Sequence, residues 1–117
     1  MYIRNGTRGN QLAESVQLAN TFMSRLRGWL GETQTAPGQG LYLTPCFWVH
    51  TFGMRMSVDA VYINRAGIVM AVRTLSPNRL GPWVPGAAGV LELAAGMCER
   101  LGCQAGDHLE QDGGQGW

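Results

Sequence analysis

Residues 58–75 read VDAVYINRAGIVMAVRTL, and this stretch decides the fold. Valine, isoleucine and tyrosine dominate it, and such residues are typical of β-strands. Residues 65–67 separate two strand-like runs, 58–64 and 68–75, so the stretch predicts a β-hairpin. Side chains alternate along a strand, which places Asp59 on the same face as the apolar side chains two and four positions later.

Shorter strand-like runs lie on both sides of this hairpin. A tight-turn pair, Asn5-Gly6, follows the first of them, and alternation in the second places Leu18 with other apolar side chains on one face. Residues 76–88 hold three prolines and predict a loop, with Trp83 packed down on the domain. The predicted strands outside the hairpin lie at 2–4, 11–19, 40–46, 90–93 and within 106–110.

Two short helices are predicted as well. Apolar side chains recur at helical spacing over residues 22–30, and residues 97–101 predict one or two helical turns that end at Gly102. Strands and helices together indicate an α+β domain, whose small sheet is strongly curved or closed into a β-barrel. We expect one domain over residues 1–110 and a flexible tail over 111–117.

The composition limits the classes of function. The chain has 117 residues, of which 45% are hydrophobic, and a formal net charge of +1. This balance argues against general nucleic-acid binding, which needs a strong basic excess. No apolar run is long enough to span a bilayer and no secretory signal is evident, so a cytoplasmic location is expected, with an exported mature form as the alternative. The glycines form no Walker or dinucleotide loop, and no cofactor is expected. The three cysteines are an odd number and suggest no disulfide framework. The oligomeric state stays open.

Residues 46–59 read CFWVHTFGMRMSVD and gather six different polar or sulfur-bearing groups. The flanking segments are apolar, and buried charges need partners, so Arg55 and Asp59 are expected to pair. We interpret the stretch as a polar pocket in a ligand-binding or accessory domain that takes a small anionic or polar ligand, or a protein partner. An internal network that fixes the strand register is the structural alternative. The candidate ligand-binding residues are His50, Thr51, Met54, Arg55 and Asp59, with Arg25 and Glu92 as outer members.

Two other chemistries stay open for the same stretch. Cys46, His50 and Asp59 are the residue types of a nucleophile, a base and an orienting acid in a hydrolase or thiol-dependent enzyme. Cys46, His50 and Met54 supply the thiolate, imidazole and thioether that favour copper(I). Glu92 is expected to face solvent by alternation within its short apolar strand, or else to pair with an arginine.

Several short motifs follow one another along the chain, namely RLRGWLG at 25–31, GLYLTPC at 40–46, HTFGMR at 50–55, VDAVYI at 58–63, Pro77, VLELAAG at 90–96 and Gly106-Asp107. In their order and spacing they resemble the DUF192 family, also called UPF0127, over residues 12–110. The resemblance implies a mixed fold with a small β-barrel core and short helices, and it places residues 50–59 and the segment around Glu92 in the family signature. It implies no activity, because the family is one of unknown function.

Overall fold

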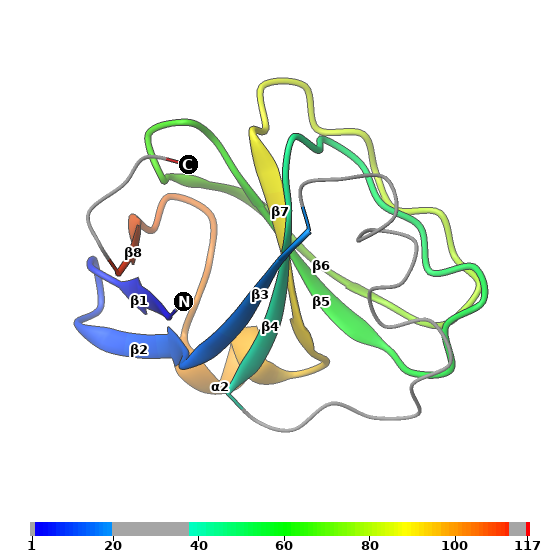
Figure 1. The fold of residues 1–117 in the computed structure, drawn as a ribbon, viewed down its shortest axis with the longest axis horizontal. Helices are drawn as coiled ribbons and strands as arrows, with labels where there is room; N and C mark the ends of the chain where they lie inside the picture. Colours follow the sequence, from blue (N-terminus) through cyan, green and yellow to red (C-terminus); the bar gives the residue numbers. More distant parts are fainter. Residues whose placement is uncertain (1, 20–37, 113–116) are drawn as a thin grey trace.

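A computed structural model describes residues 2–19, 38–112 and 117 of the chain, and Figure 1 shows how they are arranged. Eight strands and one short helix lie in this part of the chain. None of its helices has the length and apolar character that crossing a membrane requires. The elements are β1 (Ile3–Asn5), β2 (Asn10–Ala13), β3 (Ser15–Ala19), β4 (Gln39–Leu43), β5 (Val58–Ile63), β6 (Val69–Leu75), β7 (Gly89–Ala94), α2 (Met97–Leu101) and β8 (Leu109–Gln111).

The hairpin of β5 and β6 forms as the sequence predicts, with the two strands antiparallel. The side-chain oxygen of Asn64 accepts hydrogen bonds from the backbone N–H groups of Ala66 and Ile68, both at 2.9 Å. Gly67 has a φ of +83°, in the left-handed region that glycine adopts without steric cost. The turn is therefore closed by local interactions, which is why the local sequence predicts it.

The hairpin belongs to a five-stranded sheet with the order β3-β4-β7-β5-β6. In it β3 and β4 are parallel, whereas all other neighbours are antiparallel. The strands β1, β2 and β8 form a separate sheet with the order β2-β1-β8 (Figure 1). The described strands thus form a mostly-β fold of two sheets, and they do not close into the barrel that the sequence suggested.

The two sheets are separated at Glu14, where the sequence predicts one continuous strand over 11–19. The backbone N–H groups of Glu14 and Ser15 both donate to the carbonyl oxygen of Gly38, at 2.9 and 3.0 Å. This shared acceptor turns the chain from β2 into β3, so the prediction of a single strand is wrong. Because β3 then forms the edge of the larger sheet, Leu18 is 45% exposed and not part of the core.

Each face of the larger sheet packs against its own hydrophobic cluster. Leu91 of β7 and Val61 of β5 belong to a first cluster, which also includes residues of the smaller sheet and α2. Val90 belongs to a second cluster, which includes residues of the loop after β4. Because side chains alternate along a strand, Asp59 lies on the face of the first cluster and Glu92 on the face of the second.

The predicted helical turns at 97–101 are confirmed as α2. The helix ends at Gly102, whose φ of +78° is typical of a glycine that terminates a helix. The other predicted helix, over residues 22–30, lies outside the described residues.

Two tryptophans have surroundings that the sequence did not indicate. Trp83 is 62% exposed and stacks on the ring of Trp48, with centroids 5.6 Å apart, so the prediction that it packs down on the domain is wrong. Trp117 lies in the segment 111–117, predicted as a tail. Its indole nitrogen donates to the carbonyl oxygen of Leu109 at 3.1 Å, which ties the last residue of the chain to β8.

Candidate functional site

Asp59 is 1% exposed, and its carboxylate accepts three hydrogen bonds. Oδ1 accepts from the Thr74 hydroxyl at 2.7 Å, and Oδ2 accepts from the backbone N–H groups of Gly96 and Cys98 at 3.1 and 2.9 Å. The first N–H groups of a helix have no partner within the helix, so Asp59 satisfies donors at the start of α2. In this structure Asp59 joins β5, β6 and α2, and all of its described partners are structural.

The charged and imidazole members of the predicted pocket do not surround Asp59. His50 and Arg55 are exposed. Arg55 forms no ion pair with Asp59, and the ion pairs among the described residues involve other arginines. Arg25 lies outside the described residues. The predicted Arg55–Asp59 pair is therefore wrong.

Thr51 and Met54 are buried, and their contacts hold the loop between β4 and β5 in place. The Thr51 hydroxyl donates to the carbonyl oxygen of Ser76 at 2.6 Å and accepts from the backbone N–H of Arg79 at 2.8 Å. Met54 is 8% exposed and belongs to the second cluster. Their burial and these contacts support the packing of the loop.

The first of the two alternative chemistries, the one that joins Cys46, His50 and Asp59, is not assembled in the structure. Nδ1 of His50 accepts a hydrogen bond from the backbone N–H of Phe52 at 3.3 Å, while the carboxylate of Asp59 is occupied elsewhere. A base oriented by an acid needs a hydrogen bond between the two, so Cys46, His50 and Asp59 do not act as a relay. Met54 is packed in the second cluster whereas His50 is exposed, and the copper(I) set stays a prediction.

Among the predicted site residues that the structure describes, Glu92 has the surroundings least favourable for a charged carboxylate. It pairs with Leu41 of β4 and Ala60 of β5, in the middle of the larger sheet, and it is 5% exposed. Its carboxyl group forms no ion pair or hydrogen bond with the described residues. Burial raises the pKa of Glu92 to about 7. The expectation that Glu92 faces solvent is wrong, because both faces of this sheet are covered.

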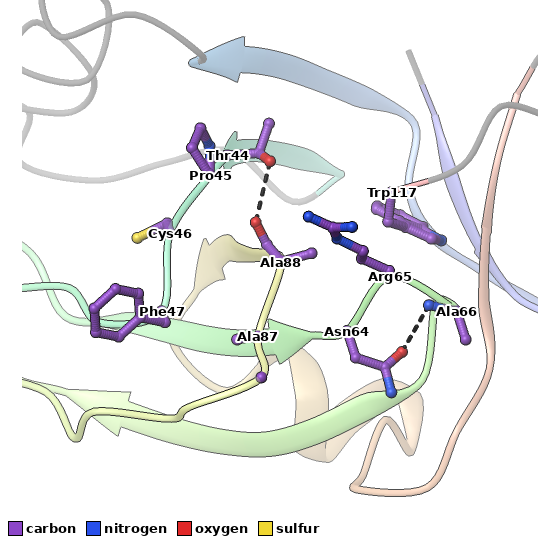
Figure 2. A pocket seen from close by; sticks show the side chains of 11 residues that line it. Thr44, Pro45, Cys46, Phe47, Asn64, Arg65, Ala66, Ala87, Ala88 and Trp117 are labelled. Carbon is purple, nitrogen blue, oxygen red and sulfur yellow. Dashed lines mark hydrogen bonds between the residues drawn. The ribbon is translucent and has the colours of Figure 1, made fainter.

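An open pocket of about 890 Å³ lies where the end of β4, the β5–β6 turn and the segment before β7 meet. Figure 2 shows the guanidinium group of Arg65 pointing toward the middle of this pocket, between Ala88 and Trp117. The residues that line it are Thr44, Pro45, Cys46, Phe47, Asn64, Arg65, Ala66, Gly86, Ala87, Ala88 and Trp117.

Hydrogen-bond donors predominate among the polar groups of this pocket. Arg65 is exposed and makes no ion pair with a described residue, and none of the described residues that line the pocket is an aspartate or glutamate. The side-chain oxygen of Asn64 is occupied by the turn, so its NH₂ group is the part that can contact a ligand. Guanidinium and amide donors without a nearby carboxylate are suited to an anion or a carbonyl oxygen.

Sequence reasoning missed Arg65 as a site residue and assigned it only to the hairpin turn. The signal was a single arginine in a turn, which is ordinary for an exposed loop. Ala88 and Trp117, which flank its guanidinium group, lie far along the chain, so only the folded structure brings them to it.

Comparisons with known proteins agree with this fold. The model of the DUF192 family, described as "Uncharacterized ACR", matches residues 3–111. A UPF0127 protein of Thermococcus sibiricus (strain DSM 12597 / MM 739) is 26% identical over 113 residues, which cover 91% of this chain and 71% of the relative. A protein of unknown function from Novosphingobium aromaticivorans DSM 12444 has a similar structure, with a TM-score of 0.80, 20% identity and coverage of 95% of this chain and 84% of that one. A Sinorhizobium meliloti 1021 protein, proposed to be a transcription regulator, has a TM-score of 0.76, 24% identity and coverage of 93% and 89%. At these identities the two solved structures support the fold alone.

Proposed function

Because the chain belongs to the DUF192 family, which is uncharacterised, we propose its function from the site itself: it is a ligand-binding domain that takes a small anion in the pocket beside Arg65. One observation carries the proposal. The Arg65 guanidinium group points into an open pocket of ligand size and has no acidic partner among the described residues there. Ligand pockets commonly enclose about 300–1,000 Å³ and hold a few placed polar groups among apolar walls.

The lining favours binding over catalysis. None of its described lining residues is a histidine, aspartate or glutamate, so these residues offer no carboxylate or imidazole that could serve as a general base. Arg65 supplies the charge, Asn64 supplies a second donor, and the rings of Phe47 and Trp117 supply apolar walls. A carboxylate or phosphate group on a partly apolar molecule fits this combination.

The first prediction concerns Arg65→Gln. Inorganic phosphate and citrate, titrated into the protein, are expected to shift the NMR signals of the Trp117 indole N–H and the Asn64 side-chain amide in a saturable way. A hydrogen bond to a charged group contributes about 1.5–3 kcal/mol, so Arg65→Gln should weaken binding by roughly tenfold or more.

Arg73→Gln is the matched control for this titration. Arg73 is also an exposed arginine, and its guanidinium donates to the carbonyl oxygen of Val72 at 2.9 Å, outside the pocket lining. The control removes the same charge from the molecule and should leave the affinity unchanged. If both variants weakened anion binding equally, the effect would come from the net charge and not from the pocket. NMR shifts that do not saturate with added anion would contradict binding at a defined site.

A further inference from the structure

Large side chains, most of them aromatic, lie along the two loops that join β4 to β5 and β6 to β7, and all but the half-buried Trp48 are exposed. We call Phe47, Trp48, His50, Phe52, Leu80 and Trp83 the aromatic surface. Phe47 is 42% exposed, Phe52 51%, Leu80 58% and Trp83 62%. Contiguous apolar groups of this kind on a protein surface are typical of interaction sites, whereas single exposed apolar residues are ordinary.

The rings of this surface contact one another in a continuous row. Phe47 meets Trp83 edge-on with centroids 5.5 Å apart, and Trp83 stacks on Trp48 at 5.6 Å. Trp48 lies 6.0 Å from His50, which stacks on Phe52 at 5.2 Å. Ring–ring contacts fix the side chains, so a partner would meet a surface that is already ordered.

The backbone beneath the rings is also fixed. The N–H of Gly81 donates to the carbonyl oxygen of Val49 at 2.9 Å, and the N–H of Val84 donates to that of Phe47 at 2.8 Å. The N–H of Thr51 donates to the carbonyl oxygen of Arg79 at 2.8 Å. Figure 1 shows the two loops running alongside each other at one side of the molecule. The aromatic surface therefore lies on hydrogen-bonded loops and not on isolated ones.

The charged residues of these two loops are all positive. Residues 44–57 and 76–88 contain two arginines, Arg55 and Arg79, and no aspartate or glutamate. Both arginines are exposed. Tryptophan and arginine are the residues that most often dominate the binding energy of protein interfaces, and charge complementarity sets the choice of partner.

We infer that the aromatic surface binds a segment of a partner protein whose apolar side chains are flanked by carboxylates. The apolar side chains pack against Trp83 and Phe52, and the carboxylates lie near Arg55 and Arg79. A second copy of this chain fits less well, because a symmetric contact would bring the like charges of two such surfaces together. Single-stranded nucleic acid also fits less well, because Trp48 and His50 already stack on neighbouring rings and two arginines do not form a basic track.

The test is a selection of random displayed peptides on the full chain, followed by fluorescence polarisation with the enriched peptides. Enriched peptides should combine aromatic or aliphatic residues with aspartate or glutamate. Trp83→Ala should weaken their binding by roughly tenfold to thirtyfold, as for a dominant interface residue. The double variant Arg55→Gln, Arg79→Gln should weaken binding at low salt and reduce its dependence on salt.

Tyr2→Ala is the matched control, because Tyr2 is 43% exposed and precedes β1 of the smaller sheet. It should bind as the wild type does, and thermal unfolding should show all variants folded, since the changed side chains are exposed. The inference would be overturned if the enriched peptides lacked aspartate and glutamate. It would also be overturned if a parallel selection on the Trp83→Ala variant enriched the same peptides equally well. Tighter binding of oligo-dT than of the peptides, or a dimer in sedimentation that Trp83→Ala abolishes, would overturn it too. Phosphate titration of Trp83→Ala should still show the Arg65-dependent site, which keeps the two proposals separate.

Discussion

Replacing Glu92 with glutamine is expected to raise the free energy of unfolding at about pH 8 by roughly 3 kcal/mol. The reason is the cost of a buried charge without a described partner. Burial raises the pKa of Glu92 from 4.5 to about 7, so at a pH above 7 the folded protein must hold a carboxylate in the middle of the sheet. Glutamine has nearly the same volume as the protonated acid and never carries this charge.

The dependence on pH has a defined sign. The unfolded chain releases the Glu92 proton near pH 4.5, whereas the folded chain keeps it until about pH 7. Between these values the folded state binds more protons, so the wild type loses stability as the pH rises through this window. Urea unfolding of both proteins at several pH values measures the effect. The two should differ little near pH 4 and most above pH 7.

Glu99→Gln is the control for this comparison. Glu99 is an exposed glutamate in α2, so its replacement should not reproduce the pH-dependent gain. If Glu92→Gln were no more stable than wild type at about pH 8, the Glu92 carboxylate would have a hydrogen-bond or ion-pair partner in the folded protein. A gain would instead mark Glu92 as a residue that costs stability. Such residues are more often found at functional sites than in cores optimised for packing.

The parts of the fold that the sequence predicts are those fixed by neighbours along the chain. The β5–β6 hairpin depends on Asn64 and Gly67, and the end of α2 depends on Gly102, so the residue types themselves carry the signal. The break at Glu14 depends on the carbonyl oxygen of Gly38, which only the folded chain brings there. No glycine or proline marks that break, so the alternation continues through it in the sequence, which predicts one strand where the structure has two.

The site was harder to predict, because closeness in sequence does not imply closeness in a strand-rich fold. Asp59 was expected to meet Arg55, four positions before it. Its carboxylate instead binds the backbone of Cys98, 39 positions later, on the face opposite to Glu92. Arg65 was visible only as a turn residue. The chemistry of each side chain could be identified from the sequence, whereas its partners could not.

The second large effect is expected for Asp59→Ala, which should lower the free energy of unfolding by about 3–5 kcal/mol. Alanine removes the acceptor of the Thr74 hydroxyl and of the backbone N–H groups of Gly96 and Cys98. Cys98 is buried, and its N–H left without a partner costs about 1–3 kcal/mol, whereas Thr74 and Gly96 are exposed and their donors can bond water, so each of those lost bonds costs roughly 0.5–1.5 kcal/mol. Urea unfolding at neutral pH gives the total, and hydrogen exchange at the amide of Cys98 reports the loss at α2 directly.

Asp59→Asn separates the hydrogen bonds of Asp59 from its charge. Asparagine keeps one carbonyl oxygen that can accept from the α2 amides, so its loss should be clearly smaller than that of alanine, and the Cys98 amide should stay protected. Thr74→Val removes only the bond to Oδ1 and should leave that amide unaffected. If the alanine variant unfolds like wild type, Asp59 does not hold α2 to the sheet.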